Sequence, residues 1–211
     1  MNWLELVKFI GFVILAYLIG SIPFAWLAGK LFKKGDIRKK GTGNVGGGNA
    51  MLVVGRFAGA IVLILDILKG SLAAWLGLHF FHSTFALMIF GLAAIIGHCN
   101  SIFLNFTGGK GVSVILGVYA VIDFKIFLLI YFIWGAMVLI TKYSSISTFI
   151  AGVIYPFILA YLQKDFYYVF YSILAAIIIT INHRDHIADF ISGKEKTTAE
   201  EYAMHRKRLK K

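Results

Sequence analysis

Two glycine-rich segments carry the residues that could bind a phosphate group. The first is GTGNVGGGN at Gly41–Asn49, which follows Lys39 and Lys40, and the second is NFTGGKG at Asn105–Gly111. Backbone N–H groups at glycines can surround an anion, and a lysine or a helix N-terminus nearby adds positive charge. Both segments interrupt apolar stretches. They therefore predict chemistry on a phosphate at the surface of a membrane.

The first segment combines five glycines with polar side chains that can donate hydrogen bonds, namely Thr42, Asn44 and Asn49. A plain connection between two helices needs turn residues but not paired asparagines and a threonine, so we favour ligand binding. The Gly-x-Gly-x-x-Gly spacing at residues 41–46 is not a dinucleotide fingerprint, because a basic stretch rather than a strand precedes it.

The second segment ends in Gly-Gly-Lys-Gly at residues 108–111. It is not a Walker A loop, because Gly111 stands where Ser or Thr would hold magnesium. Lys110 still offers an ammonium group beside the start of the next helix, which suits a phosphate. His98 approaches this loop from an apolar stretch, and a structural role and a ligand-binding role remain equally open for it.

Three further polar groups lie near these segments or inside the apolar stretches. Asp66 and Lys69 are three residues apart, so we expect them to pair with each other or with a neighbour, and structural pairing is slightly favoured over function. Residues 143–148 place hydroxyls at a helix start, where they could cap the helix or donate to a ligand. Capping is the simpler explanation for Ser144 or Ser145, but not for the whole cluster. In Asn-His-Arg-Asp-His at residues 182–186, His183 could act as a general base. The spacing there is not that of a closed metal site, so we predict no metal.

The elements that position these motifs are membrane helices. The chain of 211 residues is 59% hydrophobic and 15% charged, whereas soluble domains carry about 25% charged residues. We therefore predict an all-α integral membrane protein with seven transmembrane helices, of which the fourth is too short to cross about 30 Å of hydrocarbon unaided. The apolar segments are Leu4–Phe32, Met51–Phe81, Phe85–Phe106, Val112–Ile122, Ile126–Ile140, Ser147–Leu162 and Phe166–Ile181.

The distribution of lysine and arginine predicts the orientation. If the seven segments alternate, residues 33–50, 107–111, 141–146 and the chain from residue 182 onward share one face. The opposite face then holds only Lys8, Lys125 and Lys164. The positive-inside rule places the N-terminus outside and the C-terminus and both glycine-rich segments in the cytoplasm. The net charge of +11 is explained in this way, without a nucleic-acid partner.

Taken in order, the motifs resemble those of the bacterial membrane acyl-phosphate:glycerol-3-phosphate acyltransferases. The series is Gly-Ser-x-Pro at residues 20–23, the loop at 41–49, Asp-x-x-Lys-Gly at 66–70, Gly-His through Gly-Gly-Lys-Gly at 97–111, Tyr-x-Ser at 143–145, and His-Arg-x-x-Ile followed by Gly-x-Glu at 183–195. The resemblance therefore divides the chain into a seven-helix acyltransferase domain at 1–195 and a basic cytoplasmic tail at 196–211, which would touch anionic lipid.

The resemblance implies a multi-pass enzyme of the bacterial inner membrane whose active site faces the cytoplasm. Its reaction would move the acyl group of a fatty acyl phosphate to the 1-hydroxyl of glycerol 3-phosphate, giving lysophosphatidic acid and phosphate. No cofactor would be needed, and neither coenzyme A nor acyl carrier protein would be the direct donor. Cys99 has no evident activating base, so direct attack by the acceptor is favoured over an acyl-enzyme.

The same resemblance implies the site residues. Lys110 and His183 would be catalytic, although the leaving phosphate could be the base in place of His183. Substrate contacts would come from four of these motif regions, through Thr42, Gly43, Asn44, Asn49, His98, Gly108, Gly109, Lys110, Gly111, Ser145, His183 and His186.

The chain departs from the family pattern mainly on the acceptor side. Leu52 stands where an arginine is expected to clamp the acceptor phosphate, and His186 stands where an acceptor-binding asparagine is expected. Gly47, Gly48 and Thr107 also differ from the usual residues. These departures keep open a relative that is inactive or uses another acceptor. A transporter of a phosphorylated solute is the other alternative, but the glycine loops share one face and the chain has no inverted repeat.

Overall fold

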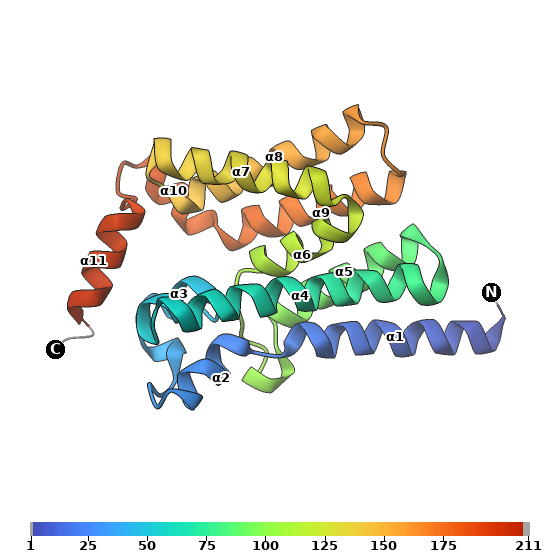
Figure 1. Cartoon of the computed structure of the whole chain (residues 1–211), viewed down its shortest axis with the longest axis horizontal. Helices are drawn as coiled ribbons and strands as arrows, with labels where there is room; N and C mark the ends of the chain where they lie inside the picture. The colour runs from blue at the N-terminus through green and yellow to red at the C-terminus, as the bar shows by residue number, and fades with distance from the viewer. Residues whose placement is uncertain (1, 209–211) are drawn as a thin grey trace.

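The computed structural model describes residues 2–208, which form helices, short loops and one isolated antiparallel bridge between Ser101 and Thr107 (Figure 1). The α-helices are α1 (Trp3–Ser21), α2 (Phe24–Leu31), α3 (Gly47–Val53), α4 (Arg56–Phe81), α5 (Thr84–Cys99), α6 (Val112–Ile122), α7 (Phe124–Thr141), α8 (Ser144–Tyr161), α9 (Phe166–Asn182), α10 (Arg184–Ile191) and α11 (Thr198–Arg208), and the 3₁₀ turns are η1 (Ile37–Lys39) and η2 (Ile102–Leu104).

Each predicted apolar segment contains a helix, so the protein is all-helical as expected. Within the described residues, four stretches are long and apolar enough to cross a membrane, namely residues 3–31, α4, α7 and α8. The pair α9 and α10 makes a fifth if it counts as one span, although it bends by 64°, and α5 and α6 are shorter apolar helices. The count of seven crossings and the orientation therefore remain predictions.

Three of the predicted apolar segments are interrupted in the structure, and the local sequence explains each interruption. Pro23 separates α1 from α2, because proline has no N–H to donate and pushes the preceding residue out of the helical region. Gly55 separates α3 from α4 with a φ of 139°, where a side chain would be strained. The third apolar segment stops being an α-helix at Cys99, and the chain turns back through positive φ angles at Asn105 and Phe106.

Glycines let the helices approach one another closely. A Cβ on Gly20 of α1 or Gly97 of α5 would overlap the backbone of the other helix. The same holds for Gly70 of α4 and Gly117 of α6, and the Ser71 hydroxyl donates to the Gly117 carbonyl over 2.8 Å. Small residues at such crossings stabilise helix pairs in lipid. The short helix α6 is therefore held against α4, with its N-terminus fixed beside the second glycine-rich segment.

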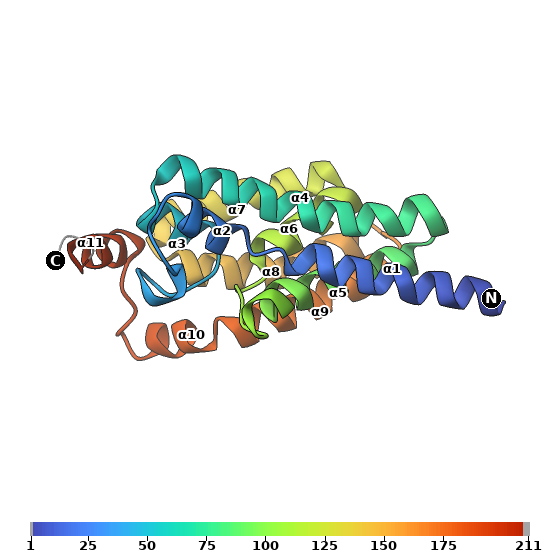
Figure 2. The ribbon, with the colours of Figure 1, turned by 90° about the horizontal axis from the view of Figure 1, so that it is seen from below.

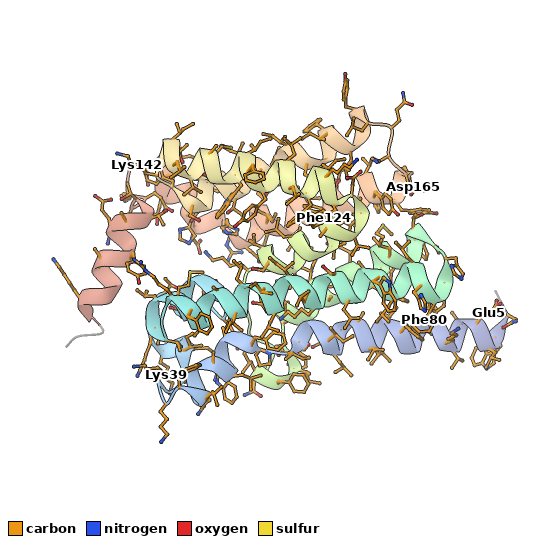
Figure 3. The ribbon with its side chains drawn as sticks, in the orientation of Figure 1. Glu5, Lys39, Phe80, Phe124, Lys142 and Asp165 are labelled. Atoms are coloured by element: carbon orange, nitrogen blue, oxygen red, sulfur yellow. The ribbon has the colours of Figure 1, made fainter. Side chains whose placement is uncertain are left out.

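Most of the helices lie roughly along the long axis of the molecule, with α6 between the α1–α4–α5 group and the α7–α8–α9 group (Figures 1 and 2). Helices α2, α3, α10 and α11 gather at one end, and α1 begins at the opposite end. Lys39 and Lys142 lie at the end that holds α2 and α3, while Glu5, Phe80 and Asp165 lie at the other (Figure 3). The motif regions therefore meet at the end that carries many of the basic residues.

Candidate active site

The two glycine-rich segments touch each other. A Cβ on Gly109 would lie 2.9 Å from the carbonyl oxygen of Val45, so the second segment fits against the first only because this residue is glycine. Arg38 adds a second link, since its guanidinium donates to the Thr107 hydroxyl over 3.3 Å and to the Leu104 carbonyl over 3.4 Å. Between the segments lies an open hollow of about 340 Å³, lined by Asp36, Arg38, Lys39, Gly43, Val45, Thr107 and Gly108.

Asn49 organises the first segment. Its side chain is 1% exposed, and its Nδ2 lies 2.9–3.2 Å from three backbone carbonyl oxygens, those of Ile37, Lys40 and Asn44. Its Oδ1 accepts the N–H of Thr42 over 2.9 Å. The amide is therefore fully used in holding the loop together. This is a positioning role, which differs from the direct substrate contact predicted for Asn49.

The other predicted residues of this loop stand closer to solvent. Thr42 is exposed, and Gly43 and Asn44 are half-buried. The Thr42 hydroxyl accepts the N–H of Asn44 over 3.3 Å, and Gly43 lines the hollow. The loop closes tightly at Gly41, where φ is 59° and a Cβ would overlap the Asn49 amide oxygen. Gly43 is thus placed where an anion in the hollow can reach it, and Thr42 and Asn44 flank it in the chain.

The second segment is pressed against the end of α5. A Cβ on Gly108 would overlap the His98 carbonyl oxygen, and one on Gly109 would overlap the His98 ring. The Gly109 N–H donates to the same carbonyl over 3.0 Å. These glycines are therefore required by packing as well as by any ligand. Gly111 then starts α6 with no side-chain cap, which leaves first-turn N–H groups that can face an anion.

His98 packs beside a buried ion pair. Lys69 Nζ lies 2.8 Å from Asp66 Oδ1, which confirms the expected pairing, and it also donates to the Ile22 carbonyl over 2.9 Å. That carbonyl is available because Pro23 interrupts the helix. His98 Nδ1 lies 3.7 Å from the same Asp66 oxygen, and all three side chains are buried. The ion pair orients the ring that supports Gly109, so of the two roles left open for His98 the geometry favours the structural one.

The end of α9 carries the other half of the site. The Asn182 amide donates to the Lys110 carbonyl oxygen over 3.1 Å and contacts Cys99 Sγ at 3.6 Å. It is a residue that sequence reasoning did not select, although it directly precedes His183. One side chain thus ties the Gly-Gly-Lys-Gly loop to the helix end that presents the predicted base.

His183 is held as a neutral imidazole. Its Nδ1 lies 2.9 Å from the Ile179 carbonyl, which can only accept, so the proton is on Nδ1 and the lone pair is on Nε2. Burial and the nearby charge of Lys110 lower the pKa of His183 to about 4. The ring is therefore unprotonated at neutral pH, as a base must be.

Two of the hydroxyls at residues 143–148, those of Ser147 and Thr148, bond to the backbone of their own helix. The expectation that Ser144 or Ser145 caps α8 is wrong, since Tyr143 is the N-cap and gives no side-chain cap. Ser147 and Thr148 donate to the carbonyls four residues earlier, because a short hydroxyl side chain reaches that position inside a helix. Ser145, the predicted substrate contact, is half-buried in the first turn.

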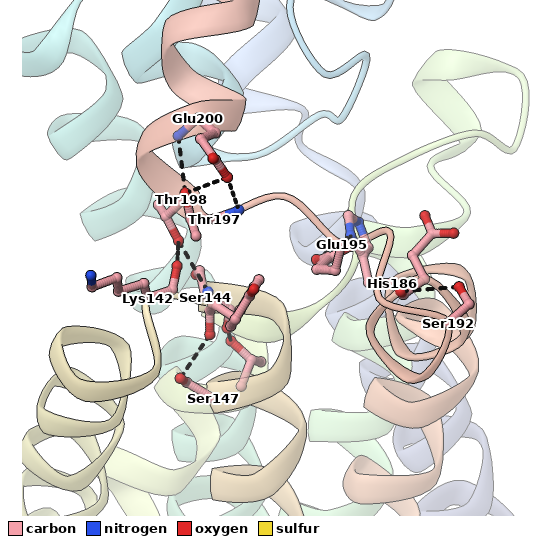
Figure 4. A network of polar contacts seen from close by, with 12 residues as sticks. Lys142, Ser144, Ser147, His186, Ser192, Glu195, Thr197, Thr198 and Glu200 are labelled. Atoms are coloured by element: carbon pink, nitrogen blue, oxygen red, sulfur yellow. Dashed lines mark hydrogen bonds and ion pairs between the residues drawn. The ribbon is translucent and has the colours of Figure 1, made fainter.

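His186 lies beside His183, with 6.2 Å between the ring centres. Its Nδ1 is 3.0 Å from Glu195 Oε1, so α10 is linked to the start of the C-terminal segment (Figure 4). The structure therefore brings His186 near the predicted base and gives its ring a carboxylate partner.

The described part of the C-terminal tail is docked on the molecule. Thr198 donates from its N–H to the Lys142 carbonyl over 2.9 Å, and its hydroxyl accepts the Ser144 N–H over 3.1 Å (Figure 4). Helix α11 continues from there to contact α3. Residues 209–211 of the predicted basic tail lie outside the described residues, and its contact with anionic lipid remains a prediction.

Comparisons with known proteins agree with this arrangement. The model of the family described as glycerol-3-phosphate acyltransferase matches residues 10–193. A glycerol-3-phosphate acyltransferase of Carboxydothermus hydrogenoformans is 37% identical over 86% of this chain and 92% of its own, and glycerol-3-phosphate acyltransferase 2 of Bacillus anthracis is 42% identical over 87% and 95%.

Solved structures support the same assignment. The glycerol 3-phosphate form of an integral membrane glycerol 3-phosphate acyltransferase superposes with a TM-score of 0.85 at 32% identity, covering 90% of this chain and 95% of that one. A lysophosphatidic acid form of such an enzyme gives the same TM-score at 31% identity, covering 93% and 99%. With its glycine-rich loops, its Lys110–Asn182 contact and its membrane helices, this chain belongs to the glycerol-3-phosphate acyltransferase family.

Proposed function

We propose that this protein transfers the acyl group of a fatty acyl phosphate to the 1-hydroxyl of glycerol 3-phosphate, giving lysophosphatidic acid and phosphate. The observation that carries the proposal is the meeting of the two glycine-rich segments beside Lys110 and the uncapped start of α6. Two phosphate groups must be neutralised in this reaction, and the region offers backbone N–H groups and cationic side chains for both. The solved relatives in glycerol 3-phosphate and lysophosphatidic acid forms support the same substrate and product.

The donor is a mixed anhydride, so its acyl group is already activated. The enzyme therefore mainly has to position the two substrates and neutralise the charges of their phosphates. Lys110 and the first turn of α6 would stabilise the negative charge of the leaving phosphate. The acceptor hydroxyl would attack the acyl carbon directly while its phosphate is held near Thr42, Gly43 and Asn44. As the C–O bond to the acceptor forms, the bond from the acyl carbon to the phosphate oxygen breaks.

The proton of the attacking hydroxyl would pass to His183 Nε2 or to the leaving phosphate. A pKa of about 4 makes His183 a weak base in the unliganded protein. Two bound phosphates would raise that pKa, because nearby negative charge favours the imidazolium. His183 would therefore gain basicity when both substrates are in place.

The acceptor side contains a cation that the motif comparison did not include. Arg38 lines the hollow between the two loops, paired with Asp36 over 2.8 Å. Its guanidinium holds the pKa of Asp36 at about 2, so the pair is ionised. With Lys39 also lining the hollow, the three charges sum to a net positive one. The hollow therefore suits an anionic acceptor even though Leu52 carries no charge.

We also propose that the enzyme lies in the bacterial inner membrane, as the family resemblance implies, with this site facing the cytoplasm, as the lysine and arginine distribution favours. The donor assignment is tested by supplying purified protein with labelled glycerol 3-phosphate and either palmitoyl phosphate, palmitoyl-coenzyme A or palmitoyl acyl carrier protein. Lysophosphatidate is expected from palmitoyl phosphate alone. Equal use of the coenzyme A thioester would overturn the acyl-phosphate assignment, and transfer to another polyol phosphate in place of glycerol 3-phosphate would reveal a different acceptor.

A further inference from the structure

Helix α8 receives its N-terminal cap from a distant part of the chain. Tyr143, its N-cap residue, gives no side-chain hydrogen bond, although the first N–H groups of a helix have no partner inside that helix. The N–H of Ser144, the first residue of α8, donates instead to the Thr198 hydroxyl over 3.1 Å, across 54 positions of sequence. The cap of α8 therefore comes from the C-terminal segment (Figure 4).

Thr198 also binds the link that precedes α8. Its N–H and its hydroxyl both donate to the Lys142 carbonyl oxygen, over 2.9 and 3.1 Å. Lys142 has a φ of 66°, a left-handed conformation that is uncommon for a residue other than glycine. The hydrogen bonds of one threonine thus fix the short link between α7 and α8 on both sides of Tyr143.

Thr198 is presented by a helix start that is itself capped. Thr197 directly precedes α11, and its hydroxyl accepts the Glu200 N–H over 3.3 Å, while Glu200 Oε2 accepts the Thr197 N–H over 3.0 Å. This reciprocal pair is a capping box, which fixes the first turn of a helix. Local bonds therefore set the backbone at Thr198 independently of α8.

The turn that Thr198 caps carries Ser145. This residue is half-buried and directly follows Ser144, and it is the residue of α8 for which the family resemblance implies a substrate contact. The Tyr143 ring, just before it, packs edge-on against Phe190 of α10, with 5.2 Å between the ring centres. A shift at the start of α8 would move Ser145 relative to the glycine-rich loops, and the cap and the ring contact both limit that shift.

We propose that Thr198 is a positioning residue for acyl transfer, because it serves as the N-cap of α8 and so holds Ser145 in place for its substrate. The proposal rests on the proposed function. Thr198 acts through the backbone of residues 142–144 and not by contact with substrate. Since the family model matches residues 10–193, this cap lies in the part of the chain that follows the matched region.

Three variants separate the hydroxyl from the rest of the tail. Thr198→Val keeps the size and branching of the side chain but removes the hydroxyl, whereas Thr198→Ser keeps the hydroxyl and should restore wild-type behaviour. Ser192→Ala is the matched control, because the Ser192 hydroxyl lies on the same C-terminal stretch and donates to carbonyls of its own helix, α10.

Hydrogen exchange of the backbone amides, measured by NMR on the full chain in detergent, tests the cap without any need for activity. Thr198→Val should speed exchange of the Ser144 N–H about fivefold, the effect of losing one helix N-cap. Thr198→Ser and Ser192→Ala should leave that exchange unchanged. Unchanged exchange at Ser144 in Thr198→Val would overturn the cap and the proposal with it.

Steady-state kinetics with palmitoyl phosphate and glycerol 3-phosphate test what the cap does for the reaction. Thr198→Val should raise KM for a phosphate substrate about threefold to tenfold, the effect of one hydrogen bond, with kcat nearly unchanged. Ser145→Ala should have a defect of its own, and adding Thr198→Val to it should change little, because residues that act through one contact are not additive.

Additive defects in the double variant would overturn the positioning role, and so would wild-type kinetics in Thr198→Val despite faster exchange at Ser144. If the wild type transfers no acyl group from palmitoyl phosphate, the proposed function fails and the positioning role fails with it. The exchange measurement then still shows whether Thr198 caps α8, so the two failures are distinguishable.

Discussion

The side-chain amide of Asn182 donates a hydrogen bond to the carbonyl oxygen of Lys110 over 3.1 Å. The two residues are 72 positions apart in the chain, and the bond fixes the Gly-Gly-Lys-Gly loop relative to the end of α9. His183 follows Asn182 directly, so one bond sets the position of the predicted phosphate-binding lysine relative to the predicted base. The consequences of this arrangement can be tested residue by residue.

Replacing Asn182 with leucine should reduce kcat/KM by about fivefold to tenfold, the effect of one neutral hydrogen bond. The change should appear mainly in KM for the phosphate substrates, because Lys110 would no longer be held in place. Steady-state kinetics checks this against Asn100→Ala, which removes a longer amide contact to the Phe106 carbonyl on the same stretch of chain. Equal behaviour of the two variants would show that Asn182 does not position the loop.

Lys110→Ala should weaken phosphate binding by about tenfold or more, because a charge-assisted hydrogen bond contributes about 1.5–3 kcal/mol. The measurement is KM for donor and acceptor. Lys142→Ala is the control, since Lys142 is an exposed lysine at the same end of the molecule. A Lys110→Ala enzyme with unchanged KM for both substrates would contradict the assignment.

His183→Gln should lower kcat by about a hundredfold or more if this residue is the general base, and by much less if the leaving phosphate takes the proton. Either outcome identifies the base. In the wild type, the lowered pKa keeps the unliganded ring neutral until the pH approaches about 4.

The same pKa predicts a pH effect on stability. An unfolded histidine titrates near 6.5, and the folded His183 near 4, so the unfolded state binds more protons between these values. Stability should therefore fall as the pH decreases from about 6.5 to about 4. Thermal unfolding in detergent should show a smaller loss over that range for His183→Gln than for the wild type or for His82→Gln. The same loss in all three proteins would contradict the lowered pKa.

The paired change Leu52→Arg and His186→Asn restores the family residues on the acceptor side. A guanidinium near the first loop can contact a phosphate through two hydrogen bonds, so KM for glycerol 3-phosphate should fall, by about tenfold if one such bond forms. KM for the acyl phosphate should not change. If acceptor KM is unaffected, those two positions do not correspond to the family's acceptor-binding residues.

The sequence predicted those features that depend on composition and on spacing along one helix. Apolar length identified the membrane helices, and the three-residue spacing of Asp66 and Lys69 predicted their ion pair, because both signals act locally. The order of the motifs also led to the right family. The motifs thus indicate both glycine-rich segments, whereas the contact between the two segments is visible only in the structure.

Features that depend on contacts between distant segments could not be predicted in this way. The bond from Asn182 joins the end of α9 to the Gly-Gly-Lys-Gly loop, and no local pattern marks it. The bonds of Asn49 within its own loop could not be predicted for the same reason, since a polar side chain in a glycine-rich loop looks the same in sequence whether it bonds a ligand or the loop itself. Helix α3 was hidden by the three glycines that precede Asn49. Such residues are poor helix formers on their own, and packing overrides their preference.

The central claim is tested most directly by the products of a single defined reaction. Purified protein in lipid vesicles is given palmitoyl phosphate and glycerol 3-phosphate, and both lysophosphatidate and inorganic phosphate are measured over time. The proposed reaction predicts that the two products appear in equal amounts and that Lys110→Ala slows both together. Release of phosphate without lysophosphatidate would contradict glycerol 3-phosphate as the acceptor, and the absence of both products would contradict acyl-phosphate chemistry at this site.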